Sequence, residues 1–172
     1  MSDNLLQLVE RMGNLRHFRG LSAEELQQII ATGSIRSYAE NITLFREEEP
    51  CAGVFVLITG SVYLKKTGPD GRENIMVMLD AVTMFNEVSV LDGGPNAATA
   101  VTATASTIWH APSTHFGELL RQHPQLPLGL LPIMAARNRW LVSQYEDLSF
   151  RTIRARTAKL LLELSDNGNQ PI

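Results

Sequence analysis

The fold is decided by the stretch Gly53-Val54-Phe55-Val56-Leu57-Ile58-Thr59-Gly60-Ser61-Val62-Tyr63-Leu64. It contains two β-rich runs, 53–58 and 61–64, of the kind that forms strands. Similar runs occupy 42–45, 74–79, 98–105 and 106–109, with turns rich in Gly, Pro and Asp between them. The runs leave no room for a helix long enough to make a parallel crossover. Residues 33–109 therefore predict an antiparallel jelly roll or barrel, not a doubly wound parallel sheet.

Helical patterns flank this β region on both sides. The first dozen residues have an apolar face at helical spacing, and Ser22 with Glu25 three residues later has the signature of a capping box. After Pro112 the sequence predicts a short helix over 113–120 and a longer one from about 126 to 149. We therefore expect a fold that is mostly β with α, a jelly roll with short N-terminal helices and a long C-terminal helix.

The long helix carries apolar residues near coiled-coil spacing, with no Gly or Pro after Pro132. At about 1.5 Å per residue it would exceed roughly 30 Å, which is more than one small domain covers. We predict that it pairs with its twin in a homodimer, although a helix packed wholly on its own barrel is the alternative. The predicted dimer-interface residues are Leu130, Ile133, Met134, Arg137, Leu141, Tyr145 and Leu148.

A final helix is predicted over 151–164. Its periodicity places one set of apolar residues on a buried side, interspersed with basic residues that are too few to indicate DNA binding. The apolar set is Ile153, Ala158, Leu161, Leu162 and Leu164, and the basic set is Arg151, Arg154, Arg156 and Lys159. Residues 165–171 are polar and turn-forming, so we expect a linker there.

Composition limits the function classes. The 172 residues are 44% hydrophobic, which favours one globular domain with a full core over a disordered or fibrous chain. Fifteen Lys and Arg against 18 Asp and Glu give a net charge of -3, without the basic excess of a nucleic-acid-binding segment. The single Cys51 excludes an internal disulfide. With neither a membrane-spanning apolar run nor the pattern of a signal peptide, we expect a cytoplasmic protein with no membrane partner.

Several stretches resemble the superfamily of the cyclic-AMP receptor protein and Fnr, which are bacterial transcription regulators. They are 15–22 (LRHFRGLS), 56–62 (VLITGSV), 68–73 (GPDGRE), 85–100 (FNEVSVLDGGPNAATA), 145–151 (YEDLSFR) and 156–164 (RTAKLLLEL). The resemblance covers essentially the whole chain. It implies a cyclic-nucleotide-binding type of sensor roll over 1–123 with the N-terminal helices, a dimerisation helix over 124–150, and a helix and linker over 151–172. That linker would lead to a winged helix-turn-helix domain absent from this chain.

The 85–100 segment resembles the family's phosphate-binding cassette. Glu87 stands where the resemblance implies a ribose-binding carboxylate, but Asn96 occupies the place of the phosphate-binding arginine and Asn86 that of a glycine. Neutral Asn supplies no countercharge for a buried phosphate. On the long helix, Leu141 and Val142 stand where the resemblance implies hydroxyl side chains that contact the base of the cyclic nucleotide. The candidate ligand-binding residues are Phe85, Asn86, Glu87, Val88, Asn96, Ala97, Ala98, Leu141 and Val142.

These departures predict a small-molecule effector other than cyclic AMP, with a backbone-only phosphate site left open. Haem, which several Fnr-like branches bind, is the alternative cofactor, yet the four histidines His17, His110, His115 and His123 are scattered. One cysteine excludes an iron–sulfur cluster, and we predict neither a metal site nor catalytic residues. The expected function is the effector-sensing and dimerisation region of a Crp/Fnr-type transcription regulator, with DNA bound only by the missing domain. The alternatives are a cyclic-nucleotide-binding regulatory module and a haem-dependent gas sensor.

Overall fold

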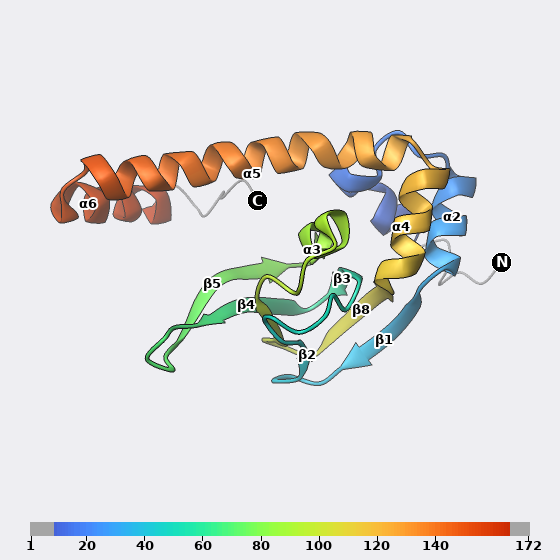
Figure 1. Cartoon of the computed structure of the whole chain (residues 1–172), viewed down its shortest axis with the longest axis horizontal. Helices are drawn as coiled ribbons and strands as arrows, with labels where there is room; N and C mark the ends of the chain where they lie inside the picture. Colours follow the sequence, from blue (N-terminus) through green and yellow to red (C-terminus); the bar gives the residue numbers. More distant parts are fainter. Residues whose placement is uncertain (1–8, 166–172) are drawn as a thin grey trace. The chain divides into compact units, whose positions relative to one another are not determined.

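The computed structural model of the chain describes residues 9–165, which divide between Pro127 and Leu128 into two compact units. The first unit holds all the described strands and the short helices (Figure 1). The second holds most of the long helix and a final helix. Within the described residues, no helix combines the length and the apolar content that crossing a membrane requires.

Two four-stranded sheets make up the first unit, and every pairing in them is antiparallel. One sheet has the order β1-β8-β3-β6, with β1 Ser34–Tyr38, β8 Ser106–Ala111, β3 Val54–Thr59 and β6 Thr83–Phe85. The other has the order β2-β7-β4-β5, with β2 Thr43–Phe45, β7 Thr99–Thr102, β4 Ser61–Thr67 and β5 Glu73–Asp80. Figure 1 shows β4 and β5 side by side as a long hairpin. The predicted mostly β jelly roll with flanking helices is confirmed.

An aromatic cluster joins the two sheets. Phe45 of β2 lies 5.1 Å from Phe55 of β3 and 6.1 Å from Phe85 of β6, measured between ring centroids, and all three side chains are buried. Because β2 belongs to one sheet and β3 and β6 to the other, these rings pack the two inner faces against each other. Phe85 ends β6, so the core fixes the point at which the 85–100 segment begins.

Short helices surround the roll at η1 Arg16–Phe18, α2 Ala23–Ala31, α3 Glu87–Asp92 and α4 Ser113–Gln122. The predicted capping box starts α2: the Glu25 amide donates to Ser22 Oγ at 3.2 Å, and the Ser22 amide donates to Glu25 Oε2 at 2.7 Å. Two early amide donors are thereby satisfied. Residues 9–13 are helical as predicted, and the rest of the predicted first helix lies outside the described residues.

The predicted long helix is α5 Gln125–Phe150, and the final helix is α6 Ile153–Ser165. Figure 1 shows α6 turning back alongside the end of α5. The predicted burial of α6 is wrong for the side chains that the structure describes: Ile153, Ala158, Leu161 and Leu162 are exposed. The reason is that α6 turns basic residues towards α5 instead, as described below. The Leu164 side chain and the predicted linker beyond Ser165 lie outside the described residues.

Candidate ligand-binding site

The 85–100 segment runs from the end of β6 through α3 to β7. Beside it lies the connection between β2 and β3, residues 46–53, which we call the 46–53 loop. The two chain segments meet through the backbone of Asn96, whose amide donates to the Glu49 carbonyl at 2.9 Å and whose carbonyl accepts from the Glu48 amide at 3.0 Å. The candidate site is therefore bounded by the 85–100 segment and the 46–53 loop, which are joined by backbone hydrogen bonds.

The Asn96 side chain is 1% exposed, and its polar atoms form hydrogen bonds with other residues of the protein. Its Nδ2 donates to the carbonyls of Arg46 at 3.0 Å and Pro50 at 3.3 Å. Its Oδ1 accepts from the Ala52 amide at 3.1 Å and from Asn86 Nδ2 at 3.0 Å. A primary amide has two N–H groups and two oxygen lone pairs, so these four contacts use its full capacity. The Asn96 side chain is thus a structural tie across the 46–53 loop.

Asn86 completes the same node. It has a backbone φ of 65° and lies just before α3 in the left-handed region, which glycine adopts freely and asparagine tolerates better than most residues. Its Nδ2 also donates to the Gly53 carbonyl at 2.8 Å, and its Oδ1 accepts from Ser89 Oγ at 3.3 Å. Asn86 therefore adopts a bend that glycine would adopt without strain, and adds a side chain that hydrogen-bonds to the 46–53 loop.

The electrostatics of this amide node are neutral. The contacts of Asn86 and Asn96 described above join amides, carbonyls and one hydroxyl. A bound phosphate needs cationic or backbone donors that are not already engaged. The node offers an anion no countercharge, and its side-chain donors already have acceptors.

The other candidate residues of the segment differ in exposure. Glu87 is buried, at 1% exposed, in the first turn of α3, and Phe85 is a core residue. Val88 and Ala97 are exposed, and Ala98 is half-buried. The structure therefore brings Asn86 and Asn96 into direct contact. Glu87, which follows Asn86 in the sequence, is buried. Leu141 and Val142 belong to the second unit, where both are exposed.

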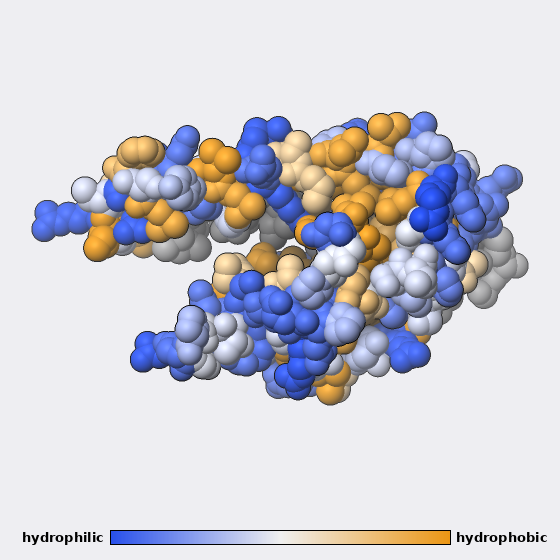
Figure 2. All heavy atoms as spheres, in the orientation of Figure 1, coloured by the Kyte–Doolittle hydropathy of each residue, from blue (hydrophilic) through white to orange (hydrophobic). Residues whose placement is uncertain are grey.

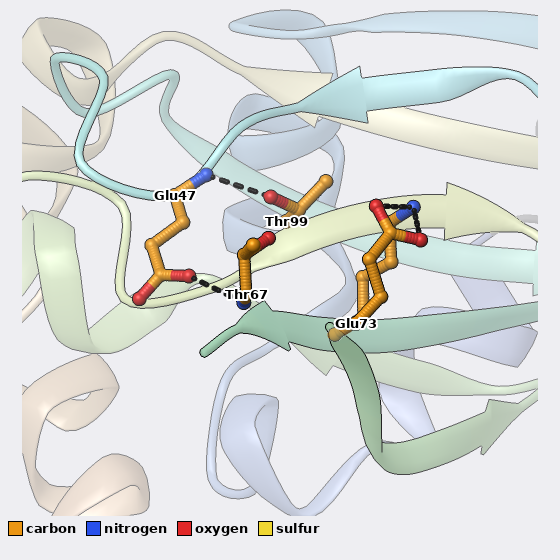
Figure 3. A network of polar contacts seen from close by, with 5 residues as sticks. Glu47, Thr67, Glu73 and Thr99 are labelled. Carbon is orange, nitrogen blue, oxygen red and sulfur yellow. Dashed lines mark hydrogen bonds and ion pairs between the residues drawn. The ribbon is translucent and has the colours of Figure 1, made fainter. Parts of the chain in front are cut away.

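Glu47, a carboxylate that no sequence motif singles out, anchors the start of the 46–53 loop (Figure 3). Its amide donates to Thr99 Oγ1 of β7 at 3.0 Å, and its Oε2 accepts from the Thr67 amide of β4 at 3.4 Å. Lys66 Nζ lies 2.8 Å from its Oε1. The hydrogen bond from Lys66 lowers the pKa of Glu47, and Glu47 in turn raises the pKa of Lys66.

Figure 3 also shows Glu73 of β5, with dashed lines that mark contacts of both its carboxylate oxygens. Both carboxylate oxygens of Glu73 lie 2.7 Å from Lys65 Nζ of β4. The Lys65–Glu73 pair therefore joins β4 to β5, and the Lys66–Glu47 pair joins β4 to the 46–53 loop. No spacing rule in the sequence connects Glu47 with Lys66, because the pair forms only once the strands are assembled.

The histidines do not form a cluster, and hydrogen bonds or ion pairs engage His110, His115 and His123. His110 Nε2 lies 2.7 Å from the Ala52 carbonyl, and its ring stacks on Phe55 with a centroid separation of 4.4 Å. His115 Nδ1 lies 3.3 Å from the Thr32 carbonyl, and His123 Nδ1 lies 3.5 Å from Glu25 Oε1. Across residues 9–165, no three His, Cys, Asp or Glu residues gather in a way that could hold a metal ion. Haem ligation by these three histidines would have to displace the contacts given.

The predicted dimer-interface residues divide into two groups along α5. Leu130 and Ile133 are buried within the single chain, and Met134 and Arg137 are half-buried. Leu141, Tyr145 and Leu148 are 57%, 70% and 64% exposed. Figure 2 shows hydrophobic residues at the surface of the second unit, among hydrophilic ones. The three exposed positions follow one another at intervals of four and three residues, so they form one stripe on the helix.

Comparison with known proteins identifies the class. Residues 35–123 match the family described as cyclic nucleotide-binding domain. The chain belongs to the cyclic nucleotide-binding domain family, and the resemblance to the Crp-type superfamily is confirmed. The matched region contains both sheets apart from Ser34, together with α3 and α4.

Individual relatives are regulators. The chain is 32% identical over 123 residues to the "CRP-like cAMP-activated global transcriptional regulator" of Mycobacterium tuberculosis, covering 72% of this chain and 55% of that protein. It is similar to the solved Thermus thermophilus Catabolite Activator Protein, with a TM-score of 0.74, 27% identity, and coverage of 90% of this chain and 72% of that one. The sensor domain of the regulator DNR from Pseudomonas aeruginosa shares the fold, with a TM-score of 0.72 and 21% identity, covering 88% of this chain and 99% of that one.

Proposed function

We propose that the chain is the effector-sensing and dimerisation region of a Crp/Fnr-type transcription regulator, which contacts DNA through a winged helix-turn-helix domain outside residues 1–172. The observation that carries this proposal is a cyclic-nucleotide-binding roll leading into a 26-residue helix that leaves an apolar stripe exposed. A helix with such a stripe is usually covered by another helix. The regulator names of the relatives support the same function.

The stripe of Leu141, Tyr145 and Leu148 pairs with the same stripe of a second copy. Such an interface is symmetric, as in most homodimers. The more N-terminal predicted positions, Leu130 and Ile133, are already buried within one chain. An effector bound in the roll acts by favouring one arrangement of the two long helices over another, so the protein works by binding and not by catalysis.

Sedimentation velocity of residues 1–172 tests the dimer. The wild-type chain should sediment as a dimer. The double variant Leu141→Glu with Leu148→Glu should sediment as a monomer, because two carboxylates per chain would be buried in the dimer interface. The matched control is Leu128→Glu, since Leu128 is equally exposed at 56% but lies about 140° around the helix from Leu141. A monomeric wild type, or an equal loss of dimer in the control, contradicts the proposal.

The effector is a molecule other than cyclic AMP. This rests on Asn96, whose neutral side chain is fully hydrogen-bonded to the protein at the place where the resemblance implies a phosphate-binding arginine. A phosphodiester held without a cation would lose its hydration with little compensation. The second candidate is a cyclic-nucleotide-binding module that uses backbone donors and Glu87. The family match and the cyclic-AMP-activated relative favour it.

A further inference from the structure

The final helix turns its charged side towards α5. Among the α6 side chains that the structure describes, only Arg156 and Lys159 are half-buried. Ile153, Leu161 and Leu162 are 73%, 62% and 65% exposed. An amphipathic helix normally buries its apolar face against its neighbour. Burial of Ile153, Leu161 and Leu162 therefore does not hold α6 against α5.

Asp147, in the last turn of α5, meets the basic side of α6. The residue is 8% exposed, and its Oδ1 lies 2.6 Å from Arg151 Nε. Its Oδ2 accepts a hydrogen bond from Lys159 Nζ, across the turn between the two helices. The contact with Lys159, with further contributions from Arg151 and Arg156, lowers the pKa of Asp147. We call Asp147, Arg151 and Lys159 the Asp147 clasp.

The turn itself contributes a second, weaker restraint. Thr152 Oγ1 accepts from the Ala155 amide at 3.3 Å and so caps the start of α6. This hydrogen bond favours a helix that begins at Ile153, but it does not determine which way the helix points. The ion pair of Lys159 with Asp147 joins the body of α6 to α5.

We propose that the Asp147 clasp holds α6 folded back along α5, and that releasing it frees α6 to swing and bury its apolar face elsewhere. Among the side chains that the structure describes, α6 meets α5 through ionic contacts, while Ile153, Leu161 and Leu162 remain exposed, so an arrangement that covers these three residues competes with the folded-back one. The turn between α5 and α6 therefore sets the direction of any segment that follows α6. The proposal concerns contacts within one chain, so it does not depend on the identity of the effector or on the dimer.

Hydrogen exchange of residues 1–172, followed by mass spectrometry, tests the clasp. Asp147→Asn should speed exchange of the α6 amides by roughly two- to fivefold, the scale expected for partly exposed ion pairs. Glu146→Gln is the matched control, because it removes an exposed carboxylate from the same helical turn and should leave α6 unchanged. Lys159→Gln should reproduce the effect of Asp147→Asn, and combining the two should add little.

Two further readouts separate a clasp from general destabilisation. The thermal midpoint of the roll should stay the same in Asp147→Asn, since the clasp lies in the second unit. High salt should speed α6 exchange in the wild type and have less effect in the variant, because salt screens an ion pair that the variant lacks. Unchanged α6 exchange in Asp147→Asn, equal acceleration in Glu146→Gln, or a lowered midpoint of the roll would each overturn the proposal.

Discussion

Replacing Asn96 by alanine removes the side chain that ties the 46–53 loop to the 85–100 segment. The substitution deletes four hydrogen bonds, to Arg46, Pro50, Ala52 and Asn86. At about 0.5–1.5 kcal/mol each, their sum has an upper bound near 6 kcal/mol. Arg46 and Pro50 are exposed residues whose carbonyls can bind water once the amide is gone. The expected loss in the free energy of unfolding is therefore about 2–3 kcal/mol.

Thermal and urea denaturation followed by circular dichroism measure this loss. A change of that size lowers the midpoint by about 5–10 °C in a chain of this length. Asn74→Ala is the control, because Asn74 is an exposed asparagine on β5 in the same unit. A loss below about 0.5 kcal/mol in Asn96→Ala, indistinguishable from the control, would refute the assignment of Asn96 as a structural tie.

Two other predictions concern the roll. Ser22→Ala removes the capping hydroxyl of α2 and should cost about 1 kcal/mol in the free energy of unfolding, and an unchanged melting curve would show that the capping box contributes nothing. For Glu47, the hydrogen bond from Lys66 holds the folded-state pKa below the ordinary glutamate value of 4.5, so its stabilising contribution is present above that pH and is lost as pH falls through the lowered value. Melting midpoints of wild type and Glu47→Gln should therefore differ near neutral pH and converge in acid, and a constant difference down to the lowest pH would contradict the Lys66 pairing.

The sequence predicted the elements whose signal is local. The runs 53–58 and 61–64 became β3 and β4 because their apolar residues pack into the core between the sheets. The long helix predicted from about 126 to 149 is observed at Gln125–Phe150. In contrast, β1 was missed because its Ser34–Tyr38 side chains are mostly exposed at a sheet edge and show no apolar alternation. Strand β6 was also missed.

The candidate site was less predictable. The resemblance located the 85–100 segment and the two asparagines, but it could not show that their side chains bind each other and the 46–53 loop. Those contacts join positions up to 50 residues apart in the chain, so they follow from the assembled roll and not from any local pattern. The burial of Ile153, Ala158, Leu161 and Leu162 in α6 was predicted wrongly, because periodicity identifies an apolar face but not the partner that covers it.

The most direct test of the central claim is a thermal-shift titration of residues 1–172 with cyclic AMP and cyclic GMP. A ligand at one hundred times its dissociation constant adds about 2.7 kcal/mol to the free energy of unfolding, which raises the midpoint measurably. Because Asn96 is fully engaged with the protein, neither nucleotide should raise the midpoint at millimolar concentration. A saturable rise with either nucleotide would contradict the account and show that the site binds phosphate through backbone donors and Glu87.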